Sequence, residues 1–346
     1  MRVAVVAART GRYVDRDGVA RTERVARGLA ARGHDVTVYC TGWWEGYDEY
    51  RETDRVTYRA VTVSPADASF VARVPGLLAV DRPDVVHARP APPAAVIAAR
   101  AGARLARTAL VVDWYGDDPS GRLSRRAARA GDRVVTPSRL VGTWVRELGA
   151  TEEQTHVVPE MLDLSLVRST EPDGDADIVA ARHLDGSANL ESLFLALAEL
   201  RGREWTATVI GDGPARAAYE AQAADLRIDD RVAFVGALPR EERLARYRAA
   251  HVFVHTATWE PFATELLWAM ACGCVGVVEY QEDSAAHELV ERRERGFRAT
   301  TPEEIEDAIV DAGDLPEWTV DESFEAFDHD AVVERWLDCY REAGAR

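Results

Sequence analysis

Lysine is absent from this sequence of 346 residues, and all 42 of its basic residues are arginine. Together with 59 acidic residues they give a formal net charge of −17. An acidic surface repels phosphate backbones and anionic lipids, which excludes nucleic acid as a partner and disfavours membrane contact unless a local basic patch exists. A salt-rich cytoplasm and the codon bias of a GC-rich genome both explain an arginine-only composition, and the sequence leaves both explanations open.

Long apolar runs are absent as well. No stretch approaches the roughly 18 residues of a membrane-spanning helix. The opening run Val3–Ala8 is too short for the core of a signal peptide, so we expect a cytoplasmic protein. Cysteine is scarce, with four residues, and Cys272-Gly273-Cys274 has no second ligand pair at zinc-finger spacing. We expect buried thiols and no metal site.

Short apolar runs alternate with amphipathic helical stretches along the whole chain. Continuous apolar strands between helices are typical of parallel sheets covered on both faces. The polar stretch Ser169–Asp175 interrupts the alternation and predicts a linker. We therefore expect an α/β protein with two doubly wound, Rossmann-like domains that face a central cleft. Open parallel sheets bind ligands at the carboxyl ends of their strands.

Two glycine-containing turns follow expected strands. The first loop, Arg9–Gly18, lacks the G-x-G-x-x-G of nicotinamide-dependent enzymes. Gly18 precedes an amphipathic helix, which indicates either a plain turn or the approach of a phosphate or sugar to the helix start. The second turn, Gly211-Asp212-Gly213-Pro214, is compatible with a nucleotide contact and with an ordinary sharp turn.

The most informative segment is TATWEPFATELLWAMACGCVGVV, residues 256–278. An apolar strand ends there in a polar loop, and a helix opens at Phe262, Ala263 and Thr264. Amides at a helix start favour an anion, whereas the carboxylate of Glu260 would accept hydrogen bonds from sugar hydroxyls. This combination suits a sugar nucleotide. The alternative is a surface acid that caps a helix.

In combination, these motifs resemble the retaining GT-B glycosyltransferases of family 4. The similarity runs from the first strand to the last helix, in the order of that family's motifs. It rests on Gly33–Val38, Asp84–Ala88, Gly211–Pro214, Arg231–Gly236, Glu260 with Phe262 and Ala269–Gly273, and His287–Val290.

The resemblance implies a GT-B fold, with an acceptor domain over residues 1–168 and a nucleotide-sugar donor domain over 169–328. Residues 329–346 would form a helix packed back on the first domain. It implies metal-independent sugar transfer from a UDP- or GDP-sugar with retention of anomeric configuration, and no bound cofactor. The acceptor stays open between a glycan, a lipid-linked and a small molecule. A basic helix face at Arg125, Arg126 and Arg129 leaves peripheral contact with the inner face of a membrane as an alternative to a solvated surface.

The resemblance also implies roles for individual residues. Arg182 and the amides of residues 262–264 would hold the diphosphate, and Glu260 would bind the donor sugar. The base and ribose would be lined by Gly211, Asp212, Gly213, Val235 and Leu238. The acceptor side would be formed by Gly18, His87, Asp113 and Tyr115. The candidate catalytic residues are therefore Glu260, Arg182, Asp113, Tyr115 and His87.

Several positions depart from the family pattern. Trp268 stands where the family has a second acid, and Glu265 would replace that acid only if the helix start shifts. Ser187 stands where a diphosphate-binding lysine is expected, and Tyr115 where a histidine is expected. Two explanations remain: a divergent donor site, or a degraded one. The alternatives to a transferase are thus a catalytically impaired GT-B nucleotide-sugar binding protein and a GT-B epimerase.

Overall fold

The structure is a computed structural model that describes residues 1–14, 16–46, 48–116 and 121–345. The chain divides into two compact units, Met1–Glu160 with His329–Arg346, and Met161–Asp328. The sequence analysis ended the first domain at residue 168, whereas in the structure the first unit ends at Glu160. The physical reason is α6 (Leu164–Ser169), whose Leu164 and Val167 are buried in the core of the second unit.

The first unit is built on a sheet in the order β3-β4-β2-β1-β5-β6-β7-β8. All neighbouring pairs are parallel except β3 with β4. Its central strands are buried on both faces, as their continuous apolar sequences predict. The strands are β1 (Arg2–Val6), β2 (Asp35–Thr41), β3 (Tyr50–Thr53), β4 (Val56–Thr62), β5 (Val85–Ala88), β6 (Ala109–Asp113), β7 (Arg133–Thr136) and β8 (Thr155–Val157).

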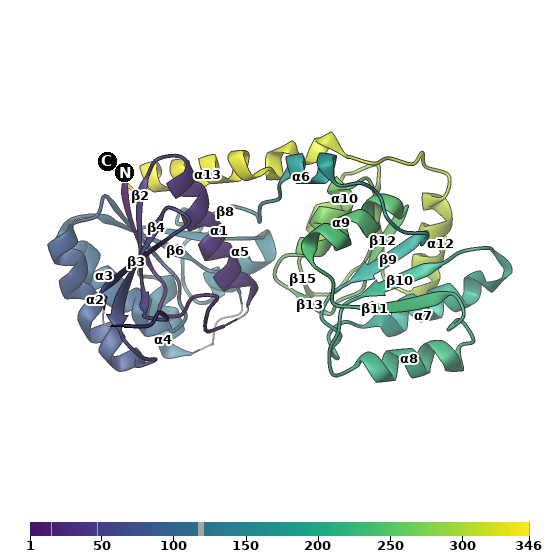
Figure 1. The fold of residues 1–346 in the computed structure, drawn as a ribbon, viewed down its shortest axis with the longest axis horizontal. Coiled ribbons are helices and arrows are strands. Elements are labelled where there is room, and N and C mark those ends of the chain that lie inside the picture. Colours follow the sequence, from purple (N-terminus) through teal and green to yellow (C-terminus); the bar gives the residue numbers. More distant parts are fainter. Residues whose placement is uncertain (15, 47, 117–120, 346) are drawn as a thin grey trace. The chain divides into compact units, whose positions relative to one another are not determined.

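Helices cover this sheet, and the C-terminal helix is one of them. The last helix lies beside the first, the yellow and purple ribbons of Figure 1. Gly28 permits this approach, because a Cβ there would lie 2.6 Å from Val333 Cγ2. The helices are α1 (Asp17–Ala31), α2 (Asp67–Asp81), α3 (Pro93–Ala106), α4 (Arg122–Ala128), α5 (Arg139–Glu147) and α13 (His329–Glu342).

The second unit repeats the plan with a parallel sheet in the order β11-β10-β9-β12-β14-β16. A separate short pair, β13 with β15, follows the end of β12. The strands are β9 (Ile178–Ala181), β10 (Ala207–Ile210), β11 (Val232–Gly236), β12 (Val252–His255), β13 (Trp259–Glu260), β14 (Val275–Glu279), β15 (Asp283–Ser284) and β16 (Gly296–Ala299).

Helices again lie between the strands of the second unit. Apolar side chains from these helices and from the strands form clusters on the two faces of the sheet. Besides α6, the helices are α7 (Leu190–Glu199), α8 (Arg216–Asp225), α9 (Arg240–Ala249), α10 (Thr264–Ala271), α11 (His287–Val290) and α12 (Pro302–Ala312).

The expected α/β alternation is confirmed in both units. The sequence analysis missed α2, which carries Pro75 within its 15 residues and has buried contacts only at Phe70, Val74 and Leu78. An internal proline removes a backbone donor and obscures the helical pattern. The short strands β3 and β8, at the edges of the sheet, were missed as well.

Candidate functional site

The first group of candidate residues gathers at the carboxyl end of β9. Arg182 follows this strand, and its Nη1 lies 3.9 Å from Oε2 of Glu260, on β13. Both side chains are largely covered, at 16% and 17% exposed. The Arg182 Nη2 also donates a hydrogen bond to Ser187 Oγ at 3.0 Å. The structure thus brings together three residues that the sequence analysis assigned to the donor.

Ser187, at the position of the expected lysine, connects Arg182 to an acid that the sequence analysis did not consider. Its hydroxyl donates to Asp185 Oδ1 at 2.6 Å, and its amide donates to the same oxygen at 2.8 Å. Burial alone would raise the pKa of Asp185, but these hydrogen bonds and the charges of Arg182 and His183 lower it. A carboxylate therefore lies near the arginine where the family pattern predicts a second cation.

A buried histidine completes the surroundings of Arg182. His255 ends β12 and is 5% exposed. Burial, and next the positive charge of Arg182, lower the pKa of His255 to about 3. The imidazole is therefore neutral at physiological pH, which limits the repulsion between it and the guanidinium.

The glycines of the 211–214 turn have a packing role. Gly211 has a φ of +137°, and a Cβ there would overlap the carbonyl oxygen of Arg182. A Cβ on Gly213 would lie 2.7 Å from the carbonyl carbon of Leu184. Backbone hydrogen bonds also join the two segments, from Arg182 N to Ile210 O at 3.0 Å and from Leu184 N to Asp212 O at 3.0 Å. These glycines allow the loops after β9 and β10 to pack against each other, and this packing role does not depend on any contact with a ligand.

The remaining candidates near this turn differ in their exposure. Asp212 is 62% exposed, lies 3.9 Å from Arg216 and accepts a hydrogen bond from the Gly213 amide at 2.8 Å. Val235 and Leu238 are partly buried against the core cluster that contains Phe262. Contact of these residues with a base and ribose stays a prediction.

The start of α10 differs in part from the expectation. Phe262 and Ala263 are buried, at 5% and 2% exposed. The amide of Thr264 donates to the carbonyl of Phe262 at 2.8 Å. It is therefore already bonded within the turn, and the expectation of three amides available to an anion needs correction at Thr264.

Glu265 and Trp268 do not supply the second acid. The Tyr247 hydroxyl donates to Glu265 Oε2 at 2.6 Å, and Arg243 lies 3.4 Å from Oε1. Trp268 is 3% exposed within the core, and Arg240 lies 5.0 Å from its ring centroid. Glu265 as a replacement for the second acid is corrected, because its carboxylate is paired with α9, and the Trp268 side chain at the position of that acid is packed into the core.

His87 and Asp113 form a buried cluster in the first unit. Asp113 Oδ1 accepts a hydrogen bond from Arg21 Nε at 3.0 Å, and its Oδ2 lies 3.6 Å from His87 Nε2. His87 Nδ1 is hydrogen bonded to the Tyr340 hydroxyl of α13 at 2.7 Å and stacks on Trp336 at 5.0 Å. These contacts join β5 and β6 to the first and last helices of the unit.

The charges in this cluster are paired with each other. Burial alone would raise the pKa of Asp113, but the charge of Arg21 and the nearby His87 ring lower it to about 2. Arg21 also donates to the carbonyls of Val158 and Pro159 and lies 3.5 Å from Glu160. An acceptor-facing role for His87 and Asp113 is therefore corrected: they are 0% and 1% exposed and fasten α13 to the sheet.

Tyr115 and Gly18 lie side by side and are also buried. A Cβ on Gly18 would lie 2.9 Å from Tyr115 Cβ and would overlap the guanidinium of Arg89. The sequence analysis missed Arg21, Glu160 and Arg89. A charged residue within an apolar pattern is the signal that could have identified such residues. Glu160 lies within the apolar run from residues 157 to 162, and Arg21 lies on the apolar face of α1.

Other expectations concern metals, thiols and membranes. The four cysteines are buried and free. Within the described ranges, no group of three or more metal-ligating side chains gathers. No helix of the described chain has both the length and the apolarity to cross a bilayer. Arg125 and Arg126 are exposed on α4, and their contact with a membrane stays a prediction.

Two Rossmann-like units, with the C-terminal helix returned to the first, define a GT-B glycosyltransferase fold. A solved neighbour, Anabaena HepE in complex with UDP and glucose, has this fold with a TM-score of 0.71 and 16% identity, over 99% of this chain and 100% of that one. The family description "Glycosyltransferase Family 4" matches residues 18–166, and "Glycosyl transferases group 1" matches residues 165–317. The chain belongs to the family 4 GT-B glycosyltransferases.

Two curated relatives match part of the chain. The 2-deoxystreptamine glucosyltransferase of Streptomyces kanamyceticus is 28% identical over 160 residues, which are 42% of this chain and 41% of that protein. The alpha-monoglucosyldiacylglycerol synthase of Streptococcus pneumoniae is 24% identical over 159 residues, 41% and 36% of the two chains. The similarity thus spans about two-fifths of the length of these relatives.

Proposed function

We propose that this protein transfers a sugar from a UDP- or GDP-sugar to an acceptor, with retention of anomeric configuration and without a metal ion. The observation that carries the proposal is the pair of Arg182 and Glu260, held beside Ser187 at the carboxyl end of β9. Ligands of open α/β sheets bind at this edge. Family membership, a neighbour solved with UDP and glucose, and relatives named as a glucosyltransferase and a glucosyldiacylglycerol synthase support it.

The chemistry requires stabilisation of a diphosphate leaving group. The bond between the anomeric carbon and the diphosphate oxygen breaks, and a bond to an acceptor oxygen forms on the same face of the sugar. The acceptor proton passes to a diphosphate oxygen, so no strong protein base is needed. Arg182 stabilises the developing negative charge, and Glu260 accepts hydrogen bonds from the sugar hydroxyls.

Glu260→Ala tests the proposal with a panel of UDP- and GDP-sugars. We expect kcat/KM for donor turnover to fall at least about 100-fold, which corresponds to ~2.7 kcal/mol of transition-state stabilisation. Glu303→Ala, an exposed acid of α12, is the matched control and should keep wild-type turnover. Turnover by Glu260→Ala within about threefold of wild type would refute the role of Glu260.

Two further measurements test retention and metal independence. We expect NMR of the first product to show the same anomeric configuration as the donor. We also expect turnover to be unchanged by EDTA. An inverted product, or loss of turnover that Mg²⁺ or Mn²⁺ restores, would contradict these parts of the proposal. A cytoplasmic location is proposed with them, and cell fractionation checks it.

A second candidate is a nucleotide-sugar binding protein without turnover. Trp268 favours it, because the position of the family's second acid is packed into the core. Ser187 favours it as well, because it stands where the family pattern has a lysine and its hydroxyl donates a hydrogen bond to the carboxylate of Asp185. Thermal stabilisation by a nucleotide sugar with steady nucleotide release indicates the transferase, whereas stabilisation without release indicates the binding protein.

A further inference from the structure

A pocket of about 200 Å³ lies in the first unit, at the carboxyl ends of β1 and β5. These parallel strands are neighbours at the centre of the sheet, and β1 pairs with β2 on its other side. The strand order therefore reverses at β1, and open α/β sheets bind ligands beside such a switch point. The residues that line the pocket are Ala7, Arg9, Val14, Arg16, Val19, Asp67, Arg89, Ala91 and Pro92.

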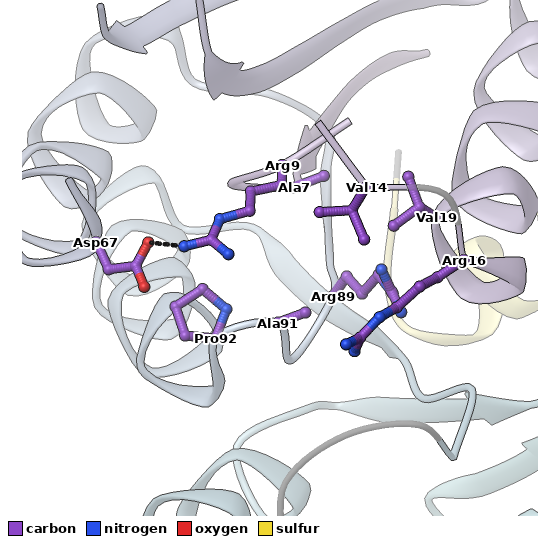
Figure 2. Close-up of a pocket in the computed structure, with 9 residues that line it drawn as sticks. All are labelled: Ala7, Arg9, Val14, Arg16, Val19, Asp67, Arg89, Ala91 and Pro92. Atoms are coloured by element: carbon purple, nitrogen blue, oxygen red, sulfur yellow. Dashed lines mark hydrogen bonds and ion pairs between the residues drawn. The ribbon is translucent and has the colours of Figure 1, made fainter. Parts of the chain in front are cut away.

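The lining of this pocket is positively charged. Figure 2 shows the side chains of Arg9, Arg16 and Arg89 around the same space, the first two from the loop after β1 and the third from the end of β5. Among the described residues that line it, Asp67 is the acidic one, and its Oδ1 lies 3.4 Å from Arg9 Nη2. The described lining thus carries three guanidinium groups and one carboxylate, in a chain whose net charge is −17. Such a local excess attracts anions.

The local backbone accommodates one of these arginines. Arg89 directly follows β5, and its amide donates to Val6 O of β1 at 3.1 Å. Its guanidinium occupies the space that a Cβ on Gly18 would need, at the first turn of α1. Arg89 is 4% exposed, so its side chain is held in place before any ligand arrives. Donors fixed in this way lose little conformational freedom on binding.

We propose that Arg9, Arg16 and Arg89 bind a phosphate monoester carried by the acceptor. This inference rests on the proposed function, since it names the class of acceptor that the transferase uses. A phosphate presents several oxygens to the fork geometry of guanidinium groups, and arginine is well suited to it. The apolar side of the pocket, formed by Val14, Val19, Ala91 and Pro92, covers the carbon skeleton next to the phosphate.

The test measures binding to the full chain by titration calorimetry at low ionic strength, with no turnover involved. The probes are glycerol 3-phosphate, its neutral counterpart glycerol, and UDP. We expect glycerol 3-phosphate to bind at least about tenfold more tightly than glycerol, and this preference to fall as salt is added. Arg9→Gln and Arg16→Gln should each weaken glycerol 3-phosphate about five- to tenfold, with UDP unchanged.

The control is Arg104→Gln, an exposed arginine of α3 whose loss changes the net charge equally. It should leave the affinity for glycerol 3-phosphate within twofold of wild type. Arg9 and Arg16 are exposed, so their variants report on binding even if Arg89→Gln fails to fold.

Three results would overturn the proposal. One is equal binding of glycerol 3-phosphate and glycerol by wild type. Another is an equal loss of affinity in the pocket variants and in Arg104→Gln. The third is weakened UDP binding in Arg9→Gln and Arg16→Gln, which would assign the pocket to the donor diphosphate. Failure of the transferase proposal is distinguishable, because it would appear as absent donor turnover while phosphate binding persists.

Discussion

Removal of the Asp113 charge should loosen the C-terminal helix from the first unit. Asp113 lies between Arg21 and His87, and His87 is in turn bonded to Tyr340 of α13. Asp113→Asn keeps the size of the side chain and one carbonyl acceptor for Arg21, but leaves the buried guanidinium with less compensating charge. The loss of unfolding free energy in such a variant comes mainly from the buried charge that remains without its partner, and less from the lost contact itself.

The expected magnitude follows from the burial of this pair. Both side chains are 1% exposed, with a separation of 3.0 Å, so water cannot replace the missing charge. Breaking a buried ion pair by removing one partner costs about 3–5 kcal/mol. Arg21 keeps Glu160 at 3.5 Å and the carbonyls of Val158 and Pro159, which places the expected loss near the lower end, about 3 kcal/mol.

Urea unfolding and hydrogen exchange measure this effect together. We expect the free energy of unfolding at pH 7 to fall by about 3 kcal/mol, and the amides of α13 to exchange faster than in wild type. Asp338→Asn is the matched control, because Asp338 pairs with Arg341 in an exposed ion pair on the same helix. It should change the folding equilibrium little. The reasoning is refuted if the two variants unfold at the same urea concentration, or if exchange in α13 is unchanged in Asp113→Asn.

Three other changes test the second unit. Gly211→Ala should lower the free energy of unfolding in urea by about 3 kcal/mol more than Gly33→Ala does. Both glycines have a positive φ, but only Gly211 has a carbonyl in the space of the new Cβ. Equal losses of unfolding free energy in the two variants would contradict this. Trp268→Glu should lower the thermal unfolding temperature, because it buries a carboxylate in the core; a stable variant with tighter UDP binding would show instead that the position is open to the donor. The folded-state pKa of His255, about 3, lies below the ordinary histidine pKa of 6.5, so the unfolded chain takes up a proton that the folded state excludes. Stability should therefore decline as pH falls from 6.5 towards 3, and His255→Asn should make this decline shallower; an unchanged pH profile would contradict the assignment.

Much of the fold could be predicted because its signals are local. Apolar runs such as Val3–Val6 and Val252–His255 alternate with amphipathic stretches, and both became parallel strands at the centre of their sheets. Hydrophobic periodicity reports which residues are buried, whatever the partner that buries them. The position of Arg182 at the end of a strand and of Glu260 just beyond another also follows from this pattern, and the structure brings the two together.

The sequence by itself therefore determined the two α/β units, the family and the places of Arg182 and Glu260 beyond their strands. Only the tertiary structure decided which polar residues are open to a ligand. His87 is covered by Tyr340, which lies 253 residues further along the chain, and no local pattern carries that contact. Trp268 is packed into the core, and Arg89, which follows β5, lines one pocket with Arg9 and Arg16 of the loop after β1. Exposure and convergence depend on packing between distant segments, whereas secondary structure is largely encoded by neighbours.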